Sequence, residues 1–166
     1  MVTENLVTKP TQSPEAMSLE LASRLPGLDI IQGLVDGNVP PPPFAGIANV
    51  NPTLVERGRV TFEGTPSAQF NNHIGVVHGG WASLLLDTTM GCAVHTMLDA
   101  GFAYSTIALN VAFIKPVRAL GAIRCEATVL HSGGRTASAE GRVYDSKGAL
   151  VAHGSATFFV FKAGAA

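Results

Sequence analysis

The sequence predicts an α+β fold in which an antiparallel sheet of five to six strands wraps around one long central helix. The first observation is a segment over residues 80–98 that is apolar on nearly every side of a helix. A helix without a polar face must be enclosed by other elements. The second is a series of four strand-like segments behind it, separated by short breaks marked by glycine or proline. Such breaks predict antiparallel neighbours.

The chain before the sheet is expected to form an N-terminal extension over residues 1–44. Its first helix is predicted over residues 14–25, with Ser13 as the N-cap and a proline at the first helical position. A second short helix is predicted over residues 28–36 and ends at a glycine. Four consecutive prolines, residues 40–43, follow. They predict an extended polyproline segment on the surface.

Residues 45–162 are expected to form one folded domain. They contain a predicted hairpin pair, the long helix and four further strands, each bounded by glycine, proline or polar residues. The expected segments are 45–52 and 54–63 for the hairpin, 80–98 for the helix, and 103–115, 121–132, 135–145 and 149–161 for the later strands.

Composition argues against several classes of protein. Hydrophobic residues make up 46% of the 166 residues and charged residues only 14%, so part of the apolar surface is expected to lie in a subunit interface. The net charge is −1 and the basic residues are scattered, which argues against nucleic-acid binding. Cys92 and Cys125 show no paired spacing, so we expect no disulfide framework and a cytoplasmic location. No signal peptide and no membrane span are predicted.

Asp87 is the strongest candidate for chemistry. It is the only Asp, Glu, Lys or Arg between Glu63 and Asp99, and it falls on the apolar helix. A buried carboxylate there is costly unless it is paired, hydrated or used. A desolvated carboxylate is also a stronger base, which suits general-base catalysis. The alternative is a structural carboxylate, hydrogen-bonded to Thr88 or Thr89 or paired at a subunit interface.

A glycine pair, Gly79 and Gly80, stands where the long helix is expected to begin. Free N–H groups and the positive end of the helix dipole gather at such a start, and glycine lets a carbonyl oxygen come close to them. The pair therefore predicts an oxyanion-type site, although the same dipeptide also suits a plain loop-to-helix turn. His78 and Asn72, which precede it, either contact a substrate or only brace the loop.

No motif in the sequence points to a bound cofactor. His73, His78, His95 and Asp87 match no metal-ligand spacing, so no metal is expected. Neither cysteine has the sequence surroundings of a nucleophile. Nucleotide-binding and serine-hydrolase motifs are absent from the sequence.

The motif Asn72-x2-Gly75-x2-His78-Gly79-Gly80-x6-Asp87-x3-Gly91 resembles the core motif of the PaaI-like hot-dog thioesterases. The stretches 106–116 and 134–136 resemble later motifs of that family, in the same order. The resemblance covers residues 60–161 and implies a hot-dog fold, assembled into homodimers and often homotetramers. It also implies hydrolysis of acyl-CoA thioesters with no metal and no bound cofactor.

The resemblance also implies roles for individual residues. It implies that the carboxylate of Asp87 is the general base or nucleophile and that the backbone N–H of Gly79 polarises the thioester carbonyl. It also implies that the side chains of His78 and Asn72 support substrate and water, and that the hydroxyl of Thr106 helps to place the water. Gly80 and Ser105 are expected to contact substrate beside them, and Ser105 is an alternative to Thr106. In the family these groups meet across a dimer interface.

Three basic residues, Lys115, Arg118 and Arg135, fall near positions where members of that family hold the phosphates of CoA. The resemblance therefore implies that they bind CoA. The alternative is that they are only solvated side chains at the ends of strands.

Two other functions fit the same fold. A non-catalytic acyl-CoA binding protein would bind without turnover, and a regulator of that kind would need a DNA-binding segment that the extension does not show. A hydroxyacyl-thioester dehydratase needs a histidine with an acidic partner in its own motif, which His78 does not match. The acyl group and its carrier, CoA or acyl carrier protein, stay open. Side chains that either line an acyl pocket or belong to the core are Phe70, Trp81, Met90 and Phe102.

Overall fold

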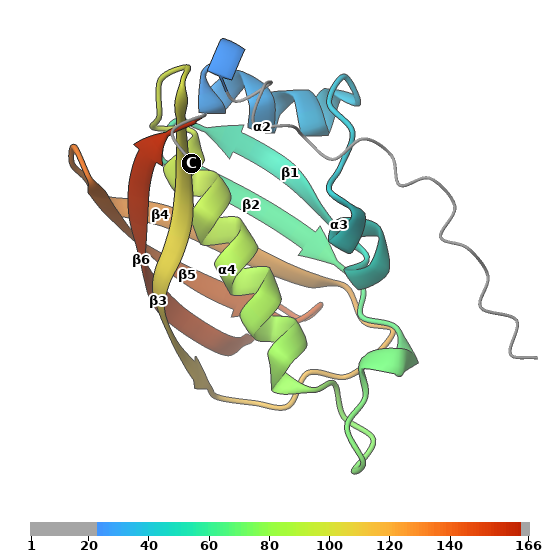
Figure 1. Cartoon of the computed structure of the whole chain (residues 1–166). Helices are drawn as coiled ribbons and strands as arrows, with labels where there is room; N and C mark the ends of the chain where they lie inside the picture. The colour runs from blue at the N-terminus through green and yellow to red at the C-terminus, as the bar shows by residue number, and fades with distance from the viewer. Residues whose placement is uncertain (1–22, 164–166) are drawn as a thin grey trace, which may run out of the picture.

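A computed structural model describes residues 23–163 as one antiparallel sheet that curls around a single long helix (Figure 1). The α+β fold expected from the sequence is therefore confirmed. The elements in chain order are α2 (Gly27–Asp36), α3 (Pro43–Ala48), β1 (Val50–Glu56), β2 (Arg59–Gly64), the 3-10 turn η1 (Ala68–Phe70), α4 (Gly79–His95), β3 (Phe102–Phe113), β4 (Ile123–Ser132), β5 (Thr136–Tyr144) and β6 (Leu150–Lys162). The predicted N-cap Ser13 and most of the predicted helix over residues 14–25 lie outside the described residues.

The six strands follow the order β1-β2-β4-β5-β6-β3, and every neighbouring pair is antiparallel. The prediction that β3 and β4 are neighbours is wrong, because β3 pairs with β6 at the far edge. Backbone N–H groups of the connection between β3 and β4 donate hydrogen bonds to other parts of the chain. The N–H of Ile114 donates to the carbonyl of Val151, and the N–H of Leu120 donates to the carbonyl of Pro66. The connection therefore passes beneath the start of α4 in Figure 1 and makes no hairpin.

The first hairpin is shifted relative to its prediction. Its turn lies between β1 and β2, at Arg57 and Gly58, and not at residue 53. Gly58 has a φ of +77°, a left-handed conformation that glycine adopts without strain. Pro52 lies inside β1 at a register shift, which an edge strand tolerates because the missing N–H faces away from the sheet.

The proline run ends in a helix and does not stay extended throughout. Pro43 is the first residue of α3, so the predictions that it is extended and that residues 45–48 belong to a strand are wrong. Proline suits the first helical position because its missing N–H would have no partner there. The helix then stops at Asn49, whose φ is 54°. The second predicted helix is confirmed as α2, with Gly37 in the left-handed conformation as its C-cap.

The central helix α4 is buried along most of its length, as its sequence requires. Five of its large side chains are at most 2% exposed: Trp81, Leu85, Leu86, Met90 and Val94. Small residues let the sheet approach, and a Cβ added to Gly91 would lie 2.7 Å from the ring of Tyr104 in β3. Among the described residues, no helix is long and apolar enough to cross a membrane.

The described part of the N-terminal extension is packed onto this core. α2 buries Ile30 and Ile31 almost completely, and the Gly27 N–H at its start donates to the carbonyl of Leu98 at 3.0 Å. Further along, the indole Nε1 of Trp81 donates to the carbonyl of Ala48 at the end of α3, at 2.9 Å. The segment is thus fixed to the core at two separate places, beyond one end of α4 and near its start (Figure 1).

We expect Gly91→Ala to destabilise the fold. Its Cβ would overlap the ring and the hydroxyl of Tyr104, both 2.7 Å away, and overpacking of a core costs about 1–3 kcal/mol. The matched control is Gly46→Ala on α3, where a Cβ meets nothing within 4 Å. Urea denaturation should show a lower free energy of unfolding for Gly91→Ala alone. Equal stability of the two variants would contradict the close packing of β3 on α4.

His95, the last residue of α4, is expected to make stability depend on pH. It is 4% exposed, and burial lowers the pKa of its imidazole from 6.5 to about 4. Unfolding therefore takes up a proton between pH 6.5 and pH 4. The free energy of unfolding should be fully present above pH 6.5 and should fall as the pH drops towards 4. The full loss amounts to about 3 kcal/mol.

Urea denaturation at pH 7, 6 and 5 measures this dependence. His95→Gln removes the titrating group, so it should flatten the fall in stability over this range. The same change at the exposed His131 is the matched control and should leave the fall as it is in the wild type. A fall of equal size in His95→Gln would assign the pH dependence to another group.

Candidate active site

The start of α4 leaves one backbone donor free. His78 is the N-cap, and its Nδ1 accepts a hydrogen bond from the N–H of Gly80 at 2.9 Å. The carbonyl of His78 accepts from the N–H of Trp81 at 3.0 Å. Within the part of the chain that the structure describes, the N–H of Gly79 donates to no protein acceptor. Of the glycine pair, Gly79 therefore offers its donor to a ligand, whereas the donor of Gly80 is already used.

His78 keeps a second nitrogen for a ligand. Because Nδ1 is an acceptor, the neutral imidazole carries its proton on Nε2. The side chain is exposed and lines a cavity of about 370 Å³ together with Gly79, Phe113 and Lys115. A carbonyl oxygen bound in this cavity would meet a free N–H at the positive end of the helix dipole.

Asn72 holds the loop that leads to the helix. Its Oδ1 accepts hydrogen bonds from the N–H groups of Ile74 at 3.1 Å and Val76 at 3.3 Å. Its own backbone N–H donates to the carbonyl of Val76 at 2.8 Å. The Oδ1 of Asn72 thus braces the loop, and the expected contact of Asn72 with substrate or water stays a prediction. Asn72 positions the segment that carries His78.

Asp87, two turns further along α4, is paired with β3. It is half-buried in the single chain, so the expectation of a fully buried carboxylate does not hold there. The Oγ1 of Thr106 donates to the Oδ1 of Asp87 at 2.9 Å. Thr106 is not one of the two partners expected from the sequence, Thr88 and Thr89. The Oγ1 of Thr89 donates instead to the carbonyl of Leu85. The contact engages one carboxylate oxygen of Asp87 and orients the other.

The strand β3 presents Thr106, and not Ser105, to the carboxylate. Successive side chains of a strand point to opposite faces, and Ser105 is exposed whereas Thr106 is half-buried. A register shift lies between Thr106 and Ala108 and leaves Ile107 61% exposed. The irregularity thus begins immediately after the residue that contacts Asp87.

A second cavity, of about 350 Å³, opens beside Asp87. Its lining comes from α4 and β3, from β1 and β2, and from residues 31–45 of the segment that precedes β1. The residues that this segment contributes are Ile31, Leu34, Pro40, Pro41, Pro42, Phe44 and Ala45. The residues proposed from sequence as pocket candidates do not line it: Phe70, Trp81, Met90 and Phe102. The signal in the sequence that could have indicated the actual lining was the helical pattern of residues 28–36 next to the proline run.

The wall of the second cavity that α4 and β3 provide carries no reactive thiol or phenolate. Burial raises the pKa of Cys92 to about 12 and raises that of Tyr104 well above its usual value. Burial also raises the pKa of Cys125, in β4, to about 12. Both thiols therefore stay protonated. Among residues 23–163, no group of three or more His, Cys, Asp or Glu side chains is placed to hold a metal ion.

Asp87 and Gly79 do not meet within one chain. They lie on the same rigid helix, roughly 12 Å apart along its axis, and they line different cavities. The chain therefore carries two separated halves of the predicted site.

The three basic candidates are also divided between these two regions. Lys115 lines the cavity at the start of α4, and Arg118 is exposed on the same connection. Arg135 lies across the sheet, where its carbonyl accepts from the N–H of Val160. Val160 is the register partner of Tyr104, so Arg135 lies at the end of the sheet where β3 begins, two strands from β3.

Sequence comparisons place the chain among known proteins. The family model described as the thioesterase superfamily matches residues 74–152. The proofreading thioesterase EntH of Klebsiella pneumoniae is 32% identical over 96 residues, which cover 58% of this chain and 69% of that protein. A Halobacterium salinarum protein named as an esterase is 36% identical over 96 residues, which cover 53% of this chain and 62% of that protein. The chain thus spans less than two thirds of the length of this second relative.

Solved structures share the fold. A phenylacetic acid degradation-related protein of Ralstonia eutropha JMP134 has a TM-score of 0.73 and 27% identity, over 78% of this chain and 98% of that chain. A Streptococcus mutans protein bound to acetyl-CoA has a TM-score of 0.64 and 22% identity, over 69% of this chain and 90% of that chain. The PaaI protein of E. coli has a TM-score of 0.73 and 19% identity, over 82% of this chain and 96% of that chain. The family model, the EntH relative and the shared fold together show that this chain belongs to the thioesterase superfamily and has the PaaI-like hot-dog fold.

Proposed function

We propose that this protein hydrolyses acyl-CoA thioesters to the free acid and CoA. The observation that carries the proposal is the pair of groups on α4, a free N–H at Gly79 and a carboxylate at Asp87 that Thr106 holds beside an apolar cavity. Thioester hydrolysis needs a donor for the carbonyl oxygen and a base or nucleophile near the carbonyl carbon. Membership of the thioesterase superfamily supports the thioester as the bond that is cleaved.

In the proposed reaction, the thioester oxygen accepts a hydrogen bond from Gly79, which stabilises the negative charge of the tetrahedral intermediate. Asp87 either takes a proton from the attacking water or attacks the carbonyl carbon itself, forming an anhydride that water then cleaves. In both routes one water is consumed and the C–S bond breaks. CoA leaves as a thiolate that takes up the proton. Thr106 orients the carboxylate of Asp87 for either role.

We place the complete site between two subunits, because β3 connects its two halves. Thr106, in the first half of β3, contacts Asp87, whereas the ring of Phe113, at its end, lies against Gly79. Antiparallel pairing of two β3 strands about a two-fold axis sets the Thr106 end of one strand opposite the Phe113 end of the other. Asp87 would then face Gly79 of the partner subunit.

The two edges of the sheet support pairing through β3. This strand exposes two large apolar side chains, Ile107 at 61% and Phe113 at 56%. A long apolar edge pairs readily with another strand unless it is blocked. The other edge, β1, is interrupted by Pro52 and a register shift. A homodimer through β3, further paired into a homotetramer, is the assembly we propose, in the cytoplasm.

The same pairing would gather the basic residues around the carrier of the acyl group. Arg135, from the Asp87 end of one subunit, would approach the Lys115 end of the other, where Arg118 also lies. Three cations suit the phosphates of CoA. The Streptococcus mutans protein, which shares the fold, was solved with acetyl-CoA, and this supports CoA as the carrier.

The first test of the proposed function is Asp87→Asn. It removes the base or nucleophile and should lower kcat for acyl-CoA hydrolysis about 100- to 10,000-fold, measured by release of the free thiol. Asp99→Asn, at an exposed carboxylate beyond the end of α4, is the matched control and should keep wild-type activity. Full activity in Asp87→Asn would overturn the mechanism. Tight acyl-CoA binding without turnover by the wild type would instead favour a non-catalytic binding protein.

Gly79→Pro tests the backbone donor. The first helical position accepts proline, and the extended His78 before it, with φ −60° and ψ 136°, suits a residue preceding proline. The substitution removes the free N–H, adds a small apolar ring, and should lower kcat about 100- to 1,000-fold. Gly79→Ala is the control, because it adds a Cβ at the same place, 3.0 Å from the exposed ring of Phe113, and keeps the N–H. Equal activity of the two variants would exclude the donor.

Co-expression of the two inactive chains tests the shared site. Asp87→Asn and Gly79→Pro chains carry different affinity tags, and the mixed dimer is purified through both tags. One of its two composite sites combines an intact Asp87 with an intact Gly79, so about half of the wild-type activity per dimer should return. A mixed dimer as inactive as its two parents would show that each site lies within one chain.

A further inference from the structure

We propose that the N-terminal segment over residues 27–48 forms the specificity wall of the acyl site, with Leu34 limiting the length of the acyl group. The preferred acyl groups are uncharged and apolar, medium-chain or aromatic. This inference rests on the proposed function, since it names the substrate class of the same site. It starts from the cavity beside Asp87, whose lining comes from both the segment and the central helix.

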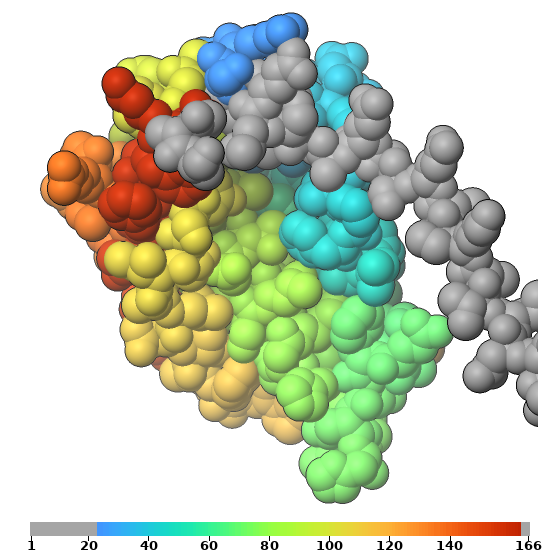
Figure 2. All heavy atoms as spheres, in the orientation of Figure 1, coloured from blue at the N-terminus to red at the C-terminus, as the bar shows by residue number. Residues whose placement is uncertain are grey.

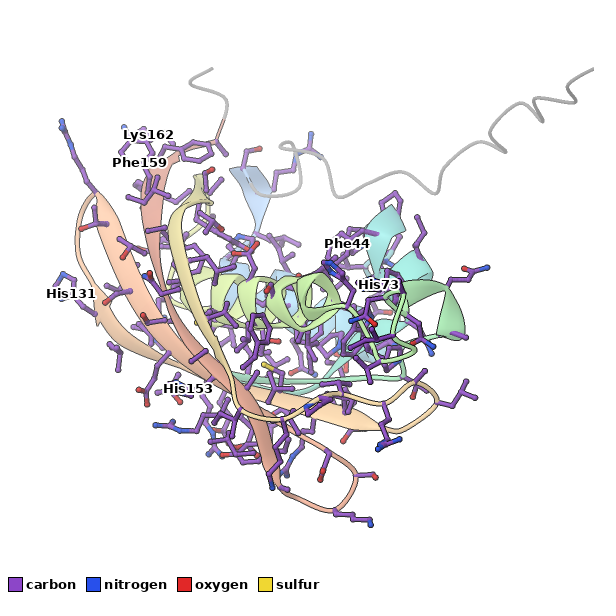
Figure 3. All side chains as sticks on the ribbon, turned by 90° about the horizontal axis from the view of Figure 1, so that it is seen from below. Phe44, His73, His131, His153, Phe159 and Lys162 are labelled. Atoms are coloured by element: carbon purple, nitrogen blue, oxygen red, sulfur yellow. The ribbon has the colours of Figure 1, made fainter. Side chains whose placement is uncertain are left out.

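The cavity has a reactive edge and an apolar interior. Asp87 and Thr88 contribute its polar side from α4, while Leu34 and Phe44 line it from the N-terminal segment. Figure 2 shows the surface hollowed between the cyan atoms of the N-terminal segment and the yellow-green and yellow atoms of α4 and β3. In Figure 3, Phe44 lies on the segment beside α4, away from the strands that carry His131 and His153. An acyl group attacked at Asp87 would extend into this space.

The wall is held rigidly enough to select by size. A Cβ added to Gly27 would lie 1.9 Å from the carbonyl oxygen of His95, so only glycine permits the start of α2 to sit against the end of α4. The other end of the segment is tied by the hydrogen bond from Trp81 to Ala48. Ile31, which lines the cavity, is 2% exposed. A wall fixed at both ends excludes a chain that is too long, whereas a loose flap would move aside.

The volume of the cavity indicates the size of the acyl group. An apolar protein cavity of about 150 Å³ binds benzene. The cavity beside Asp87 measures about 350 Å³, which on that scale holds an acyl group of up to roughly 14 carbon atoms. An acetyl group would leave most of it unfilled. Each additional buried CH₂ tightens binding about fourfold, so larger groups that still fit should be preferred.

The charges around the cavity exclude acidic acyl groups. None of the described residues that line it is Lys or Arg. His95 is neutral at physiological pH because burial lowers its pKa to about 4. Asp87 would repel a second carboxylate. A dicarboxylic acyl group would therefore lose its hydration without gaining a partner.

Leu34 offers the sharpest test because its neighbour provides a matched control. Leu34 is half-buried and lines the cavity, whereas Val35 is 40% exposed and does not. We expect Leu34→Trp to lower kcat/KM for decanoyl-CoA and phenylacetyl-CoA at least tenfold while butyryl-CoA hydrolysis changes less than twofold. Val35→Trp should leave the whole profile unchanged. Leu34→Ala enlarges the cavity and should shift the optimum towards longer chains.

Binding of a non-hydrolysable decyl-CoA thioether, measured by calorimetry on the same full-length variants, separates this inference from the proposed function. If the wild type hydrolyses thioesters but the Leu34 variants keep its profile and affinity, the specificity wall is wrong and the function stands. If no thioester is hydrolysed, the function fails. In that case tenfold weaker thioether binding in Leu34→Trp, but not in Val35→Trp, still supports the wall, and equal binding overturns it. Thermal denaturation confirms that each variant is folded, and Leu34→Ala replaces Leu34→Trp if the larger residue prevents folding.

Discussion

The burial of α4 is the constraint on which the other features of this fold depend. A helix with apolar side chains on every side is stable only when all of its faces are covered. The curled sheet covers one side, and α2 and α3 help to cover the other (Figure 1). The hydrogen bond from Trp81 and the contact of Gly27 with His95 mark the two places where this second cover is fastened. The N-terminal segment is therefore part of the core.

The candidate site occupies the places where this cover is incomplete. The helix must begin somewhere, and its first N–H, on Gly79, has no helical partner. The cover also opens beside Asp87, where the carboxylate keeps contact with solvent and with Thr106. Because a helix is a rigid rod, these two groups are held apart and cannot meet within one chain. In the proposed homodimer a second subunit unites them, and the fold of the single chain puts the wall of the second cavity next to Asp87.

Much of this was readable from local sequence, and the errors have physical causes. The pattern of α4 and the left-handed Gly37 that ends α2 depend on neighbouring residues only, so they were predicted. The position of the turn in the first hairpin was not predicted correctly. Both Pro52 and Gly58 are turn signals, and the pairing of β1 with β2 decides between them. The partner of Asp87 was sought on its own helix, at Thr88 or Thr89, and proved to be Thr106 on β3. The division between an extension and a domain at residue 44 stays a prediction.

The sequence by itself determined which residues are the candidates for chemistry, since an isolated carboxylate on an apolar helix and a glycine pair at its start are local facts. Only the tertiary structure decided what surrounds them. That β3 pairs with β6 and not with β4, and that Leu34 and Phe44 reach the cavity of Asp87, depends on contacts between residues far apart in the chain. Periodicity shows which face of an element is apolar. Which two faces meet follows from how the whole chain satisfies its backbone hydrogen bonds and buries its core at once.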